Sequence, residues 1–437
     1  MSNQINDEEE GDKVIKKEPF IDGEEIGESP KSRILLYYGL TVGAMLLIVI
    51  IVFVIAVKFG GTSSESGKKN SFTSRYISED NARIKLFNSD LKNFISSMTI
   101  DGKESNITDE YTFESKGEHV IEVALKEELD SLEKLFKNCT ELTVVNLSQL
   151  RTKKVTSMAE MFYDCSKLTS VDLSVLDTTN VKNMSNLFKG CLNLESINLN
   201  RTFTSNVENM SNMFYGCGKL KSLNLKSFKT LKVKDMSGMF MNCESLNELN
   251  LSNFNTSEVI NMKNIFNSCS SLKSLDLKNI DTSKVNDISY MFASLSSLTS
   301  LNLTNFNTKQ VIDMSYMFYE CNSLKEIDLK SFETSNLKQM TNMFYNCESI
   351  TSLDLKHFST DKVEDMGAAF CGCKKLEYLD IRRFSTNGLV LKISVFENIC
   401  EKGEIYYNSK YFDKSLFSDT IIENWKNIDF AYITNDY

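Results

Sequence analysis

The stretch NLTNFNTKQVIDMSYMFYECNSLKEIDL, from Asn302 to Leu329, contains a full copy of a pattern that recurs every 26 residues along most of the chain. Phenylalanine returns at this interval without a gap from Phe136 to Phe396, and threonine returns from Thr152 to Thr386. A fixed period of this length is the signature of a solenoid, in which one supersecondary unit stacks on copies of itself. The repeat therefore predicts one long array rather than several globular domains.

The spacing of apolar residues predicts the conformation of each coil. In the unit from Leu168 to Leu194, the triplet Val171-Asp172-Leu173 alternates apolar and polar residues as a strand does. The apolar residues that follow have the three- and four-residue spacing of a short helix packed against a core, at Val181, Met184, Leu187, Phe188 and Cys191. We predict an α/β solenoid, a right-handed array with a parallel β-sheet on one face and short helices on the other.

Two columns of the repeat are given structural roles. The phenylalanines are predicted to fill the core, at Phe162, Phe188, Phe214, Phe240, Phe266, Phe292, Phe318 and Phe344. The threonines stand just before the helical run, where a hydroxyl can accept a hydrogen bond from a free backbone N–H. They are predicted to cap the helices, at Thr178, Thr230, Thr256, Thr282 and Thr308.

Nine of the eleven cysteines fall on one position of the repeat, and Leu295 fills the same position in one coil. A position that accepts leucine is apolar and buried, so we predict free thiols there. Disulfides between neighbouring coils are the alternative, because stacked strands lie about 4.8 Å apart and a bridge needs a Cα separation of roughly 4.4–6.8 Å. One cysteine per coil lacks the paired ligands of a zinc site, so we expect no metal and no cofactor.

The outward strand position carries a column of polar residues, at Asn224, Asn250, Asp276, Asn302, Asp328 and Asp354. One interpretation is a solvated sheet face whose Asn and Ser side chains hydrogen-bond along the stack. The other is a ligand-binding face, since solenoids commonly bind partners along such a surface. The net charge of −10 argues against nucleic acid as a partner.

The segment before the repeat predicts attachment to a membrane. Residues 1–33 are polar and acidic and are expected to be disordered. Residues 34–57 carry no charge, and as a helix they would span about 36 Å, enough to cross a hydrocarbon core of roughly 30 Å. The alternatives are a cleaved signal peptide, although its apolar region is usually shorter, and a buried core helix, for which the later sequence supplies no partner. We predict a single-pass membrane protein.

Basic residues flank both sides of this span, so the positive-inside rule scarcely discriminates between the two orientations. The predicted orientation places the N-terminus in the cytoplasm and the solenoid outside the cell. The remaining expected boundaries are a flexible linker at 58–75, an N-terminal flanking or capping segment at 76–118, the solenoid at 119–396 and a C-terminal cap at 397–437.

The pattern LxxLxLxxFxTxxVxxMxxMFxxCxx, as at Leu298 to Asn322, resembles the BspA-like leucine-rich-repeat surface proteins with 26-residue repeats of the mycoplasma-lipoprotein type. The resemblance covers residues from about 119 to 400. It implies a cell-surface protein without catalytic activity that mediates adhesion or protein recognition, with an extracellular protein or a cell-surface ligand as its partner.

Two other classes of function compete with a surface adhesin. An intracellular scaffold tethered to the membrane would agree with unpaired cysteines, which persist in reducing compartments. An enzyme would need a reactive site, but neither His119 nor His357 lies near a Ser or Cys nucleophile motif in the sequence. The aspartates of the strand column lie on an open face that offers no cleft to perturb a pKa. We therefore expect no enzymatic activity.

Overall fold

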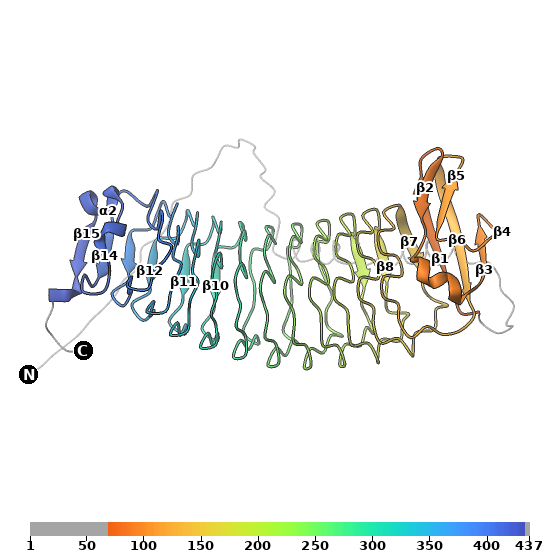
Figure 1. Cartoon of the computed structure of the whole chain (residues 1–437), viewed down its shortest axis with the longest axis horizontal. Helices are drawn as coiled ribbons and strands as arrows, with labels where there is room; N and C mark the ends of the chain where they lie inside the picture. Colours follow the sequence, from red (N-terminus) through yellow and green to blue (C-terminus); the bar gives the residue numbers. More distant parts are fainter. Residues whose placement is uncertain (1–68, 433–437) are drawn as a thin grey trace, which may run out of the picture. The chain divides into compact units, whose positions relative to one another are not determined.

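The computed structural model describes residues 69–432, which form a stack of repeated coils between two caps (Figure 1). The expected acidic tail at 1–33 and the expected membrane helix at 34–57 lie outside the described residues. Within residues 69–432, no helix is both long enough and apolar enough to cross a membrane.

The N-terminal cap is an antiparallel β structure. Its elements are β1 (Ser71–Ser78), β2 (Ala82–Lys85), the 3-10 helix η1 (Ser89–Phe94), β3 (Ile95–Ile100), β4 (Lys103–Ser105), β5 (Glu110–Phe113) and β6 (Gly117–Leu125). Strand β1 begins inside the segment expected to be a linker. Strand β6 pairs antiparallel with both β1 and β3, so it belongs to the cap and not to a first coil. The expected boundaries at 75 and 119 are therefore wrong.

The cap continues directly into the coils through one shared sheet. Strand β7 (Leu142–Asn146) pairs antiparallel with β1 on one side and parallel with β8 (Ser170–Asp172) on the other. Strand β9 (Ser196–Asn198) follows, which gives seven strands in the order β4-β3-β6-β1-β7-β8-β9. Because β1 occupies the edge of β7, the N-terminal cap closes the strand side of the first coil.

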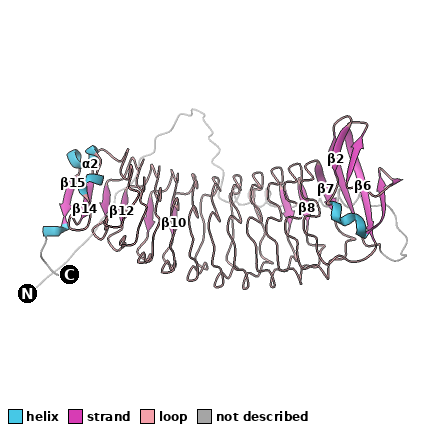
Figure 2. Ribbon diagram, in the orientation of Figure 1, coloured by secondary structure: helices cyan, strands magenta, loops and turns pink. Residues whose placement is uncertain are grey.

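The parallel sheet of the coils is interrupted, as Figure 2 shows. Its later parts are β10 (Ser300–Asn302) with β11 (Glu326–Asp328), and then β12 (Ser352–Asp354) with β13 (Tyr378–Asp380). Between β9 and β10, the described coils contain only one bridge on this side, from Ser222 to Glu248. The sheet predicted on one face is thus present in separate pieces.

The side of the coil opposite the strands carries the unbroken ladder. We call this side, formed in one coil by residues 183–191, the turn side. From Met184 to Gly190, every second backbone N–H donates to a carbonyl of the next coil at 2.8–3.0 Å. Parallel bridges join the coils without a gap from Ser131 to Leu391. The turn side is therefore the continuous hydrogen-bonded seam of the solenoid.

The turn side contains no helix in any described coil, so the predicted short helices are wrong. Each coil places two residues in the left-handed region, such as Asn186 (φ 55°) and Gly190 (φ 78°), and all eleven copies of both positions do the same. In an α-helix the N–H groups beyond the first turn bond within the segment, whereas here alternate N–H groups bond to the next coil. A succession of turns produces the same three- and four-residue apolar spacing.

The core is built from stacked columns of identical side chains. The phenylalanine rings form one stack from Phe136 to Phe396, with neighbouring ring centroids 5.3–6.0 Å apart. The eight phenylalanines assigned to the core are at most 1% exposed. The nine cysteines of the repeat are free and buried, which agrees with the prediction of thiols in an apolar column.

The C-terminal cap extends the last piece of sheet. Strands β14 (Glu404–Tyr407) and β15 (Lys426–Asp429) add in parallel to β13, with η2 (Lys414–Leu416), α2 (Asp419–Asn424) and η3 (Phe430–Tyr432) around them. Phe417 packs against Phe396, the last ring of the stack, with centroids 5.7 Å apart. The cap thereby covers the apolar end of the final coil.

Candidate recognition face

We call the outward side of the strands the strand face. Of its six polar residues assigned to ligand binding, five are exposed: Asn224, Asn250, Asp276, Asn302 and Asp328. Asp354 is half-buried, and the next residue of the column, Asp380, is fully buried. The structure therefore places the predicted residues in one row, but the row becomes less exposed toward the C-terminal cap.

Each side chain of this row is fixed to the turn that follows its strand. The Oδ1 atom of Asn224 accepts the N–H of Lys226 at 3.3 Å, and that of Asp276 accepts the N–H of Lys278 at 3.1 Å. Asn and Asp commonly hold a backbone turn in this way. The column therefore ends the strands as well as lining the face, which sequence reasoning had not anticipated.

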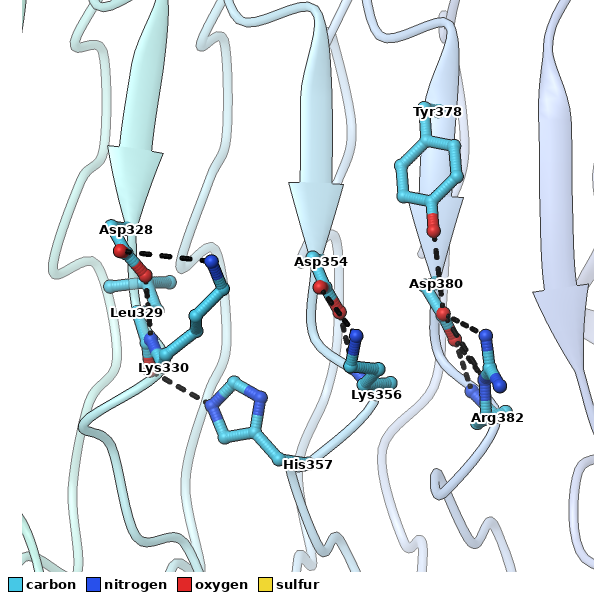
Figure 3. Close-up of polar contacts among 9 residues, drawn as sticks. All are labelled: Asp328, Leu329, Lys330, Asp354, Lys356, His357, Tyr378, Asp380 and Arg382. Carbon is cyan, nitrogen blue, oxygen red and sulfur yellow. Dashed lines mark hydrogen bonds and ion pairs between the residues drawn. The ribbon is translucent and has the colours of Figure 1, made fainter. Parts of the chain in front are cut away.

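Ion pairs within single coils occupy the C-terminal half of the strand face (Figure 3). The Lys278 Nζ lies 2.9 Å from the Asp276 carboxylate, and the Lys356 Nζ lies 3.1 Å from that of Asp354. The hydrogen bond from Lys278 lowers the pKa of Asp276. Burial raises the pKa of Asp354, but the hydrogen bonds and charge of Lys356 outweigh burial, so the net shift is downward. The face thus carries fixed pairs of opposite charge.

The row ends in a cluster of aromatic and arginine side chains. Arg382 binds the buried carboxylate of Asp380 through Nε, at 3.0 Å from one oxygen, and through Nη2, at 2.5 Å from the other. The guanidinium lies 4.1 Å from the ring centroid of Phe430. The rings of Tyr378 and Tyr406 are 5.2 Å apart. Burial first, and then the charge of Asp380, raise the pKa of Tyr378 to about 12.

Sequence reasoning missed this cluster because two of its members, Tyr406 and Phe430, come from the cap and lie outside the repeat. The sequence did contain a partial indication of this cluster. Tyr378 replaces the Ser or Glu found from Ser170 to Ser352, and Arg382 replaces the lysine of the two preceding coils. Both substitutions fall in the last coil before the cap, where a new neighbour is available.

The threonines predicted to cap helices instead join one coil to the next. The hydroxyl of Thr256 donates to the carbonyl of Asp281 at 2.8 Å and accepts the N–H of the same residue at 2.7 Å. The hydroxyls at Thr178, Thr230, Thr282 and Thr308 make the same pair of bonds with the next coil. The capping role was wrong because no helix follows these residues.

A serine, a histidine and a carboxylate meet in the N-terminal cap, although the sequence places them far apart. The His119 ring lies 2.8 Å from Asp101 through Nδ1 and 3.0 Å from the Ser78 hydroxyl through Nε2. Ser78 is 1% exposed, and its hydroxyl donates to the Ser115 carbonyl at 2.9 Å. A nucleophile must be accessible to its substrate, and Ser78 is buried. The hydrogen bonds among these three side chains instead hold the strands of the cap together.

The second histidine, His357, lies in the coils and binds the Leu329 carbonyl at 2.8 Å (Figure 3).

Comparisons with known proteins give a family match and similarities to solved structures. A crystal structure of a TLR13–ssRNA13 complex is similar at 16% identity and a TM-score of 0.23, over 60% of this chain and 47% of that chain. The present chain therefore spans less than half of that protein's length, and the TM-score is too low to establish a shared fold. The curated proteins contain no match.

The family described as "Mycoplasma protein of unknown function, DUF285" matches residues 130–224, 217–326, 272–384 and 295–409. These overlapping matches follow the coils and cover more than half of the chain. The chain belongs to the DUF285 family.

Proposed function

We propose that this chain is a membrane-anchored cell-surface protein that recognises a protein ligand through its strand face. The observation that carries the proposal is the row of side chains from Asn224 to Asp354, each held by the turn that follows its strand. Side chains that are ordered before binding lose less conformational entropy when a partner docks. A repeated row also suits many similar contacts, whose energies add through multivalency.

The C-terminal end of the row supplies residue types that concentrate binding energy. Tyrosine and arginine are enriched among interface residues that contribute most to affinity, and Tyr378, Tyr406 and Arg382 lie together there. Each of the three is partly exposed. A ligand that follows the row would reach this cluster last, so the cluster is the expected anchor.

The proposal includes neither catalysis nor a cofactor. The strand face is open, and its carboxylates are paired with lysines of their own coils. The pKa values of Asp276 and Asp354 are lowered in these pairs, which suits recognition by charge rather than proton transfer. Attachment to the membrane would come from residues 34–57, and the solenoid would lie outside the cell.

The second candidate is a scaffold on the cytoplasmic side of the membrane. The observation that favours it is that every cysteine from Cys139 to Cys400 is a free thiol, as is usual in a reducing compartment. Burial weakens this argument, because ten of these thiols are enclosed in the core and would resist oxidation in either compartment.

Treating intact cells with protease separates the two candidates. We would express the full chain with an epitope tag after Tyr437 and add protease outside the cells. Loss of the tag, combined with adhesion of untreated cells to immobilised extracellular-matrix proteins, is the expected result. A tag that survives until the cells are lysed would reject display on the surface and favour the scaffold.

A further inference from the structure

The two ends of the turn-side ladder remain open among residues 69–432. In inner coils, every second N–H of the turn side donates to the next coil. In the last coil, the N–H groups of Lys392 and Ser394 have no such acceptor within the described part of the chain. In the first coil, the carbonyls of Ser131 and Glu133 likewise have no donor there. The caps close the strand side and leave these positions on the turn side uncovered.

Within residues 69–432, two of the rungs that are open at the last coil are also open at the first coil. Met366 donates to Leu391, and Ala368 donates to Ile393. Lys392 and Ser394 stand at the donor positions one coil later, while Ser131 and Glu133 stand at the acceptor positions in the first coil. The donors of the last coil and the acceptors of the first coil therefore match in register.

The neighbouring rung is closed at the first coil, and at the last coil its side chain is buried. The carbonyl of Leu135 accepts the N–H of Asn88, which precedes η1, at 2.8 Å. At the other end, Phe396 is 1% exposed and lies beneath Phe417 of the C-terminal cap. Ser131 and Glu133 in the first coil and residues 390–394 in the last coil are exposed, so a short edge is available at each end.

The last coil is also unusually apolar along this edge. Val390 is 76% exposed, Leu391 51% and Ile393 74%. The preceding coil carries Glu364, Asp365 and Gly367 at these positions. Terminal repeats normally need a polar outer face for solubility, so this change from polar to apolar residues indicates a contact.

The first coil offers a matching recess. A groove of about 420 Å³ lies between η1 and the coil edge, and Ser131 and Glu133 are among its lining residues. Its apolar part includes Leu91 and Phe94, the latter 40% exposed. Its acidic part includes Asp90, Asp130 and Glu133, of which Glu133 is paired with Lys134, while Lys392 on the edge of the last coil is paired with Asp413. The groove thus offers carbonyl acceptors, apolar surface and negative charge to the edge of the last coil.

We propose that a second copy of this chain docks head to tail, with residues 390–394 of one copy extending the turn-side ladder at residues 131–133 of the next. The contact uses different surfaces on the two copies. Such a heterologous interface does not close on itself unless the rotation between copies forms a ring, so it generates chains of molecules.

Sedimentation velocity of the full chain tests the proposal, in a mild detergent because residues 34–57 are expected to enter a membrane. Over about a hundredfold range of concentration, the mean mass should rise above that of one copy. The triple variant Val390→Glu, Leu391→Asp and Ile393→Ser introduces residue types that inner coils carry at these positions, so the fold should be retained. Its association should be at least about tenfold weaker.

A matched control changes apolar residues that are exposed at the Val390 position of inner coils. Ile260 and Ile312 are 47% and 46% exposed and lie between two neighbouring coils. The double variant Ile260→Glu and Ile312→Glu should associate as the wild-type chain does. A triple variant that associates like the wild type, or a wild-type chain that stays at the mass of one copy throughout, would overturn the proposal.

Mixing two variants tests the head-to-tail arrangement itself. Phe94→Glu should block the groove while leaving residues 390–394 intact, so this variant alone should not associate. Mixed with the triple variant, it should give a pair of two chains and nothing larger, since each variant contributes one intact end. Variants that both keep the wild-type thermal transition and yet fail to pair would contradict the arrangement.

Discussion

The thiol of Cys243 donates a hydrogen bond to the backbone carbonyl of Phe214, 3.2 Å away in the preceding coil. The equivalent bond is present in eight coils, from Cys165 to Cys373. Cysteine is small enough for this part of the core, and it also donates to a buried carbonyl. Leu295 shows that the position accepts a purely apolar side chain as well.

The buried thiols predict a loss of stability in alkaline solution. Burial raises the pKa of Cys243 to about 12. An unfolded chain releases the thiol proton near pH 8.5, whereas the folded chain keeps it, so the unfolded state binds fewer protons above that pH. The stabilisation is complete below about pH 8.5 and is lost progressively as the pH rises toward 12.

Urea unfolding of the wild type and of Cys243→Val measures this effect for one thiol. Between pH 7.5 and pH 10, the wild type should lose about 2 kcal/mol more unfolding free energy than the variant. Tyrosine and lysine residues titrate in both proteins, so their contributions cancel in the comparison. Equal losses would show that Cys243 is not buried in the folded state.

Removing one ring from the phenylalanine stack should damage the coils on either side. Phe240 is fully buried, and its neighbours in the stack are Phe214 and Phe266. Phe240→Ala is expected to cost about 3–5 kcal/mol. Each coil contacts only its neighbours, so amide exchange should accelerate between residues 214 and 266. Faster amide exchange only at the chain ends would contradict the expectation that each coil stabilises its direct neighbours.

Substitutions at Thr256 can distinguish two roles of the threonine hydroxyl: hydrogen bonding to the next coil, or capping a helix. Thr256→Val leaves the N–H and the carbonyl of Asp281 without their partner and should cost about 2–4 kcal/mol. Thr256→Ser keeps the hydroxyl and should cost less. Amide exchange decides the role. The amide of Asp281, in the next coil, should lose protection, whereas a cap would protect the residues directly after Thr256.

The 26-residue period predicted the solenoid and its core columns, but neither the backbone path within each coil nor the contacts with residues outside the repeat. The 26-residue columns located the Phe and Cys core because identical stacked residues share one environment. The short helices were wrong because Val181, Met184 and Phe188 have the same spacing in a helix and in successive turns. Asn186 and Gly190 were the available signal, since these residue types tolerate positive φ.

The candidate site was predictable only in part, for the same reason. The strand-face row follows from the repeat, and the structure places it in one line. The Arg382 cluster and the open edge at Val390 depend on the C-terminal cap, which has its own pattern. The hydrogen bonds from Asn224 and Asp276 to the turns also require the backbone path, which the alternation of apolar and polar residues does not specify.

Positive φ on the turn side predicts a stabilising glycine. Ala368 has a φ of 52°, where a Cβ atom is unfavourable. Ala368→Gly should raise the unfolding free energy by about 0.5–1 kcal/mol. The control is Ala293→Gly, at a buried position outside the positive-φ set, which should be destabilising. Destabilisation by both substitutions to a similar extent would contradict the left-handed conformation at residue 368.

The last prediction concerns the charge of the strand face. Replacing Asp276, Asp328 and Asp354 together by asparagine removes three carboxylates but keeps the Oδ1 atom that holds each turn. The fold should be unaffected, because Asn224, Asn250 and Asn302 already occupy the same position in other coils. Binding that uses the carboxylates should weaken by about tenfold, since individually modest charge contacts add across a repeated surface.

The measurement is adhesion to immobilised extracellular-matrix proteins by cells that display the full chain, at low and high salt. The matched control makes the same change in net charge away from the strand face, with Glu208→Gln, Glu258→Gln and Glu364→Gln. All three glutamates are paired with lysines, as the three aspartates are, and all three are exposed, as Asp276 and Asp328 are. If adhesion weakens in the control and is unchanged in the Asp variant, the ligand does not bind at the strand face. Stronger adhesion in the Asp variant would instead assign the contact to Lys278, Lys330 and Lys356, and so to an acidic partner.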